Sequence, residues 1–164
     1  MDRQSRPRWL LRSFAVACAA WPPFAMTQPA LPDALVQSLV AAAQQNFWGR
    51  AVLSSGETVQ PVDDTERTTP VIPIVDSARV VDAARPVGQA IWCNVEWQPY
   101  YLAFMQTERS KPWSEKQIAF IGVLFGLTQG TFSSALTQRG SCSPEARENV
   151  VTNVGAALKA LAEP

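Results

Sequence analysis

Apolar positions are most concentrated between Trp113 and Gly140, and this stretch predicts one long helix. Residues 118–127 are all apolar or glycine, so we expect this helix to be buried on nearly all sides and covered by the other elements. Both ends are marked in the sequence. Ser114 and Gln117 have the spacing of a capping box, in which each side chain bonds an amide of the first turn. Gly140 is typical of the position just after a helix.

Further helices are predicted where apolar residues recur three and four positions apart. The first covers residues 34–48, and Ser143 followed by proline begins a last helix that runs almost to the C-terminus. Between them, short helical stretches are expected on both sides of Pro86 and after Pro99, because proline interrupts a helix. No strand pair emerges. The predicted fold is therefore all-α, a bundle of about four helices preceded by an N-terminal helix.

Residues 54–76 differ from the rest of the chain, because they are polar, acidic and punctuated by proline. Pro73 lies in the middle of a short β-branched run and cannot donate to a sheet, so this run is expected to be extended or an edge segment. An irregular segment of this length is either a functional loop or a linker, and we expect residues 54–76 to be a linker over the surface. The N-terminal helix in residues 31–53 would then be a semi-independent arm on a bundle domain of residues 77–164.

The N-terminal region resembles a secretory signal. Its first twelve residues carry four arginines and one acidic residue, a short apolar segment follows, and Ala17-Cys18-Ala19 fits the rule of small residues at a cleavage site. Residues 1–30 are thus expected to be a signal peptide with a mature N-terminal extension, and the protein to be periplasmic or secreted. The apolar segment is too short to cross a bilayer, so we expect no stable membrane span after cleavage. An ordinary N-terminal helix, or an anchor lipidated on Cys18, remains the alternative.

Charge argues against nucleic acid as a partner. The whole chain has 14 basic and 14 acidic residues, and without the first twelve residues 10 basic and 13 acidic ones remain. No basic patch with interleaved aromatic residues survives in that mature part, and such a patch is the usual footprint of nucleic-acid binding.

Cysteine usage agrees with export. Once the signal is removed, the mature chain keeps Cys93 and Cys142, and an even pair in an oxidising compartment predicts one disulfide. The alternative is two buried free thiols.

The chain contains no histidine, which excludes Ser-His-Asp and Cys-His catalysis and histidine-based metal or haem sites. We expect no cofactor and no metal. Glu96 and Glu108 could face one another across the bend at Pro99, but exposed surface positions are the preferred interpretation of both. The acidic residues 63, 64 and 66 lack the spacing and the glycine of a calcium loop, so a solvated acidic loop is expected there.

Two patterns are candidate interaction surfaces. Gly122, Gly126 and Gly130 recur every fourth residue on the long helix, and we expect this stripe to allow close packing against a neighbouring helix of the bundle, or else of a partner chain. The second pattern is a dense aromatic segment, whose side chains exceed what one helix face can bury, so part of it should form a recognition patch. The candidate binding residues are Trp92, Trp97, Tyr100, Tyr101 and Trp113.

Two similarities to known families can be stated. The half from Cys93 to Leu161 resembles the small acid-stress chaperones of the bacterial periplasm, which are all-helical with one disulfide of similar spacing. The order Cys93, long apolar helix, Cys142 and amphipathic final helix is also similar to periplasmic immunity proteins against peptidoglycan-degrading effectors. The segment before Ser77 departs from both families, and no functional residue is carried over from either.

These patterns favour an exported, non-enzymatic protein that binds another protein, in the manner of a chaperone or of an immunity or inhibitor protein, with a homodimer as one possibility. The alternative is a small-molecule or lipid carrier, or an enzyme accessory subunit, that uses a cavity within the bundle. An apolar cavity inside the bundle would favour the carrier, whereas a filled core with an exposed aromatic patch would favour the binder.

Overall fold

The computed structural model describes residues 31–163, and this part of the chain folds into helices, as the sequence predicts. The predicted signal peptide lies in residues 1–30, outside the described residues. Within them, the one β pairing is an isolated antiparallel bridge between Val52 and Thr58. The helices are α1 (Asp33–Phe47), α2 (Asp64–Thr68), α3 (Ile74–Trp92), α4 (Gln98–Arg109), α5 (Glu115–Thr137) and α6 (Pro144–Ala162).

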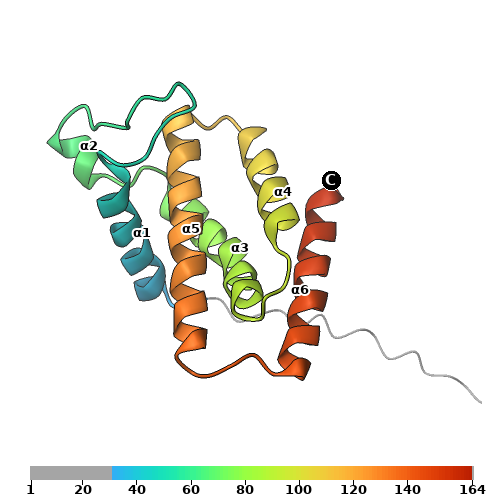
Figure 1. The fold of residues 1–164 in the computed structure, drawn as a ribbon. Helices are drawn as coiled ribbons and strands as arrows, with labels where there is room; N and C mark the ends of the chain where they lie inside the picture. The colour runs from blue at the N-terminus through green and yellow to red at the C-terminus, as the bar shows by residue number, and fades with distance from the viewer. Residues whose placement is uncertain (1–30, 164) are drawn as a thin grey trace, which may run out of the picture.

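The long helix α5 is the centre of the bundle. Figure 1 shows it between α1 and α4, with α3 behind it and α6 beyond α4. The most extensive interface joins α3 and α5, while α6 packs on α3 and α4. The predicted capping box is confirmed, since the Ser114 side chain accepts from the Gln117 amide and the Gln117 side chain accepts from the Ser114 amide.

The prediction that α5 is buried on nearly all sides is wrong. Its buried face consists of Phe120, Ile121, Leu124, Phe125 and Thr128. The opposite face stays half-exposed, because no helix of residues 31–163 lies over it. By length and composition α5 could cross a membrane, with 23 residues and a mean hydropathy of 1.4 over its most apolar window, of which 28% is buried. In the fold this helix packs against α1, α3 and α4.

Helix α3 is continuous through Pro86, where the sequence pattern predicted a break. A proline inside a helix removes one backbone hydrogen bond. Packing against α5 outweighs this loss, because α3 buries apolar side chains both before and after the proline. Those before it are Val80, Val81 and Ala84, and those after it are Val87 and Ala90.

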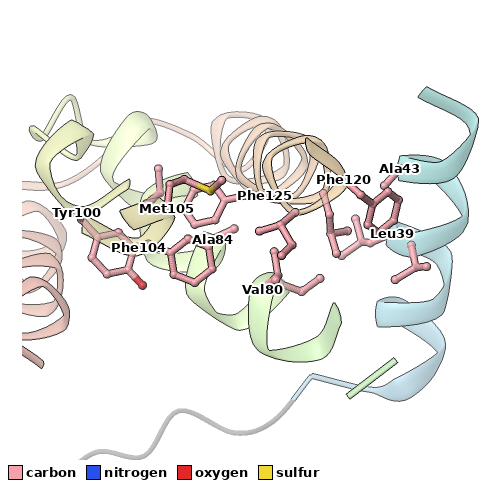
Figure 2. Packing of buried hydrophobic residues seen from close by; sticks show 14 of the residues in the cluster. Leu39, Ala43, Val80, Ala84, Tyr100, Phe104, Met105, Phe120 and Phe125 are labelled. Carbon is pink, nitrogen blue, oxygen red and sulfur yellow. The ribbon is translucent and has the colours of Figure 1, made fainter. Parts of the chain in front are cut away.

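Residues 54–76 are not a linker, and α1 is not a semi-independent arm. Val59 and Ile72 are each 1% exposed and belong to the same core as the buried residues of α1 and α5. Phe47 of α1 meets Phe120 of α5 edge to face, with ring centroids 5.2 Å apart. Figure 2 shows the core as a continuous row of side chains from Leu39 on α1 to Tyr100 on α4. Val59 stands alone between polar residues, and Ile72 lies in the short run around Pro73. Neither pattern has the helical spacing that predicts burial.

The close helix contact expected at Gly122, Gly126 and Gly130 is absent within the described structure. A Cβ added at Gly126 or Gly130 would meet nothing within 4 Å, because the stripe lies on the open side of α5. The close contact is made instead by Gly88 of α3. A Cβ there would lie 2.7 Å from Cβ of Phe132 and 2.9 Å from the carbonyl oxygen of Gln129. The interpretation of the stripe as packing inside the bundle is therefore wrong.

The predicted disulfide joins Cys93, directly after α3, to Cys142, two residues before α6, with a Cα–Cα distance of 5.1 Å. Next to it, the Trp92 indole donates a 2.8 Å hydrogen bond to the carbonyl oxygen of Gly140. Together these contacts hold the end of α3 against the turn between α5 and α6.

Candidate functional site

A groove with a volume of about 590 Å³ opens on the exposed side of α4 and α5. Tyr101, Met105 and Arg109 of α4 line one side, since residues four apart lie on the same face of a helix. α5 contributes Glu115, Ile118, Ala119 and Gly122, which again share one helix face. Trp113, in the connection between the two helices, and the segment Val52–Ser54 complete the lining.

Gly122 gives the groove its depth. A Cβ at this position would come within 3.8 Å of the Tyr101 hydroxyl and 4.0 Å of the Met105 methyl group. These are ordinary van der Waals distances, so the glycine leaves open space between α4 and α5 that a larger side chain would fill. The sequence pattern predicted close helix packing at Gly122, whereas in the structure this residue lines a surface groove.

The wall residue Trp113 is positioned by the buried carboxylate of Glu108, whose Oε2 accepts a 3.2 Å hydrogen bond from the indole nitrogen. The Glu108 side chain is 1% exposed. Arg79 of α3 donates to both of its oxygens, at 2.6 and 2.9 Å, and the Lys111 ammonium donates at 2.9 Å. A buried carboxylate needs such partners, because an unpaired buried charge is strongly unfavourable.

These contacts set the protonation of Glu108. Burial by itself raises the pKa of this carboxyl, but the hydrogen bonds from Arg79 and Lys111 outweigh it, so the pKa lies below its ordinary value. The same pair raises the pKa of Arg79. Glu108 is therefore ionised at neutral pH and links α3, α4 and the wall of the groove. The preferred interpretation of Glu108 as an exposed carboxylate is wrong, while Glu96 is exposed as expected.

At the other rim, Glu115 joins the start of α5 to the segment Val52–Ser54. The Ser54 amide donates a 2.7 Å hydrogen bond to Oε1 of Glu115, and the Ser54 hydroxyl donates to the same oxygen. Hydrogen bonds from the Ser54 side chain and backbone lower the pKa of Glu115. This contact closes one end of the groove with a carboxylate that already has partners.

The structure divides the predicted aromatic surface among several places. Tyr101 and Trp113 line the groove, and Trp97 lies beside Tyr101 with ring centroids 6.2 Å apart. Tyr100 is 5% exposed and lines a separate groove beside α6, and burial raises its pKa to about 12. Trp92 is the last residue of α3 and donates to the Gly140 carbonyl beside the disulfide. Tyr100 and Trp92 are thus corrections to the candidate surface. Tyr100 points to a different side of α4 from its neighbour Tyr101, and Trp92 lies on α3.

The predicted acidic loop has structural roles. Asp63 caps α2 by accepting from the Glu66 amide at 2.7 Å, and Glu66 forms a 2.6 Å ion pair with Lys116. Within residues 31–163, no group of three or more acidic or cysteine side chains is placed to hold a metal ion.

Sequence reasoning missed Met105, Arg109, Ile118 and Val52–Ser54 as lining residues. The position of Arg109 four residues after Met105 and eight after Tyr101 was the available signal, because it places all three on one helix face. Nothing in the pattern indicated that residues 52–54 would reach this face.

The fold and groove define the protein as a disulfide-linked, all-α bundle with an open, partly aromatic groove on its surface. The chain matches no protein family model, no curated protein and no solved structure.

Proposed function

We propose that the protein is exported and binds a segment of another protein in the groove between α4 and α5. The observation that supports this proposal is the pair of half-exposed aromatic side chains, Tyr101 and Trp113, which flank an open groove with apolar side chains at its base. Tyrosine, tryptophan and arginine are the residue types that contribute most to binding energy at protein interfaces. Their polar ends and apolar rings suit a surface that is exposed in the free protein and covered in the complex.

The site is also prepared for binding before a partner arrives. Trp113 is held by Glu108, and Tyr101 packs on the buried ring of Phe125 with centroids 5.0 Å apart. Side chains that are already fixed lose less conformational entropy on association, so their contact area contributes more affinity.

The carrier alternative has less support. The groove opens to solvent along one side, whereas pockets for small molecules and lipids bury most of the ligand surface. The interior of the bundle is occupied by buried side chains that include Phe104, Phe120 and Phe125. The disulfide is compatible with an oxidising, exported location, and export itself remains part of this proposal.

The groove can be blocked by a larger side chain at Gly122, which lines it. Gly122→Leu puts a side chain into the groove and favours the helix, since leucine is a better helix former than glycine. Gly130→Leu makes the same change on α5 outside the groove, where a new Cβ meets nothing within 4 Å, and is the matched control.

The mature wild-type chain and both variants should be used to capture partners from the exported fraction of the native cell, with analytical ultracentrifugation of each protein alone. We expect a defined protein to be retained by the wild type and Gly130→Leu and lost with Gly122→Leu. Equal retention by all three proteins would contradict the proposed site. Loss of a dimer in Gly122→Leu alone would identify a second copy of the chain as the occupant.

A further inference from the structure

We propose that the occupant of this groove is an extended peptide that adds to the free backbone edge at Val52, places an apolar side chain between Tyr101 and Met105, and sets a carboxylate against Arg109. This inference rests on the proposed function and specifies the chemistry of the partner.

The free edge follows from the bridge between Val52 and Thr58. The two hydrogen bonds that flank this bridge run from the Leu53 amide to the carbonyl of Glu57 and from the Val59 amide to the carbonyl of Ala51, both at 2.8 Å. In such an antiparallel pair the N–H and C=O of Val52 itself point away from Thr58. Within residues 31–163 neither group has a hydrogen-bond partner.

The free groups of Val52 face the groove. Backbone groups two residues apart in an extended segment point to the same side. The Ser54 amide points to Glu115 on α5, so the Val52 N–H and C=O are directed to the α5 side as well. The Val52 side chain is 57% exposed and also lines the groove. An unpaired strand edge beside apolar side chains is the arrangement used in recognition by strand addition, in which main-chain bonds give affinity and side-chain pockets give specificity.

The carboxylate requirement follows from Arg109. Arg109 lines the groove, and its side chain forms no ion pair or hydrogen bond within the described residues. The other charged side chain of the lining, Glu115, already accepts from Ser54. The one charged side chain of the lining that has no partner within the described residues is therefore the cation Arg109. A guanidinium binds a carboxylate through two parallel hydrogen bonds, so an aspartate, a glutamate or a C-terminal carboxylate is the complementary group.

The apolar side chain is inferred from the space at Gly122, whose nearest neighbours across the groove are Tyr101 and Met105. In an extended peptide alternate side chains point to the same face. One apolar residue can therefore enter this space while its neighbour faces solvent, and a helix of ordinary width would not use the Val52 edge at all.

The test uses peptides selected from a random library displayed on phage, with the mature chain as bait and Gly122→Leu as counter-selection. Each selected peptide is synthesised with a fluorescent label, and its Kd is measured by anisotropy. Val52→Pro removes the outward N–H without breaking an internal hydrogen bond, and proline is tolerated on such an edge. Thr58→Pro removes the outward N–H from the other side of the same bridge and is the matched control. Thermal melts establish that both variants are folded.

We expect Val52→Pro to weaken binding roughly tenfold, as for a lost main-chain hydrogen bond, and Thr58→Pro to leave it within about twofold. Arg109→Glu should weaken binding roughly tenfold as well, whereas Arg139→Glu, just beyond the far end of α5, should not. Replacing the acidic residue of the peptide with lysine should restore binding to Arg109→Glu.

The outcomes separate this inference from the function it rests on. Peptides that lose affinity for Gly122→Leu but bind Val52→Pro and Thr58→Pro equally would leave the groove as the binding site and overturn strand addition. Affinity that does not change in Arg109→Glu would overturn the carboxylate. A library that yields no peptide with preference for the wild type over Gly122→Leu would overturn both the inference and the proposed function.

Discussion

Glu108 on α4 and Arg79 on α3 form a two-point ion pair, with hydrogen bonds of 2.6 and 2.9 Å to the two oxygens of a carboxylate that is 1% exposed. Arg79 also lies 3.5 Å from Asp76, and Lys111 and Trp113 complete the surroundings of Glu108. Removing one member of a buried pair leaves the other charge without its partner, which is more costly than the pair itself is favourable. The same carboxylate therefore stabilises the bundle, through Arg79, and holds Trp113 in its position in the groove.

Glu108→Gln should lower the free energy of unfolding by about 2 kcal/mol at neutral pH, because the amide cannot accept two charged donors as the carboxylate does. Chemical denaturation monitored by circular dichroism measures this change. Glu96→Gln, at an exposed position before α4, is the control and should be nearly neutral. Equal stabilities for the two variants would contradict the role of Glu108.

The stability difference between the wild type and Glu108→Gln should also depend on pH. Because the pKa of Glu108 is lowered in the folded protein, the unfolded chain binds more protons between the two pKa values. The stabilisation is complete above the ordinary carboxyl value of about 4.3 and is lost as the pH falls through the folded value. Denaturation of the wild type and Glu108→Gln between neutral and acid pH should show a stability difference that shrinks in acid. A difference that grows in acid would show that the sign is wrong.

Gly88→Ala should destabilise the protein by about 1–3 kcal/mol, because the new Cβ would overlap Phe132 and the Gln129 carbonyl at the interface of α3 and α5. Gly126→Ala is the matched change on α5. It meets nothing within 4 Å and should stabilise by about 0.5–1 kcal/mol through helix propensity. Melting temperatures should move in opposite directions for the two variants. A lower melting temperature for a monomeric Gly126→Ala would support the original packing interpretation of the stripe.

Replacing Cys93 and Cys142 with alanine should cost about 4 kcal/mol in the chain-entropy description of a crosslink that spans 49 residues. Val150 and Val154 are the only buried residues of α6, so its amides should show the largest gain in hydrogen exchange when the bond is removed. Urea denaturation of the wild type with and without reductant is the companion measurement. Two titratable thiols in the native, unreduced protein would refute the bond.

Export predicts a mature N-terminus between Ala20 and Leu31. Mass spectrometry of protein from the exported fraction tests this directly. An intact Met1 would contradict cleavage, and a lipid on Cys18 would indicate an anchored protein instead of a free one.

The sequence alone determined those elements that are stabilised by contacts between neighbouring residues. The start of α5 was predictable because Ser114 and Gln117 satisfy each other's backbone amides without help from elsewhere. The start of α6 at Ser143 and Pro144 follows from the same local chemistry, and the disulfide followed from the parity of the mature cysteines. The all-α class followed from the helical spacing of apolar residues.

Tertiary structure alone decided the rest. Pro86 stays inside α3 because packing on α5 compensates the lost hydrogen bond. Residues 54–76 join the core through Val59 and Ile72, whose sequence context has no helical spacing. A glycine makes a close helix contact or lines an open groove depending on the helix opposite it. The spacing of glycines along the sequence therefore could not show that Gly88 is at a close contact and Gly122 in a groove. Glu108 is ionised and buried because Arg79, 29 residues away in the sequence, reaches it in the fold. Contacts between distant residues carry no local pattern, and the candidate site is built from such contacts.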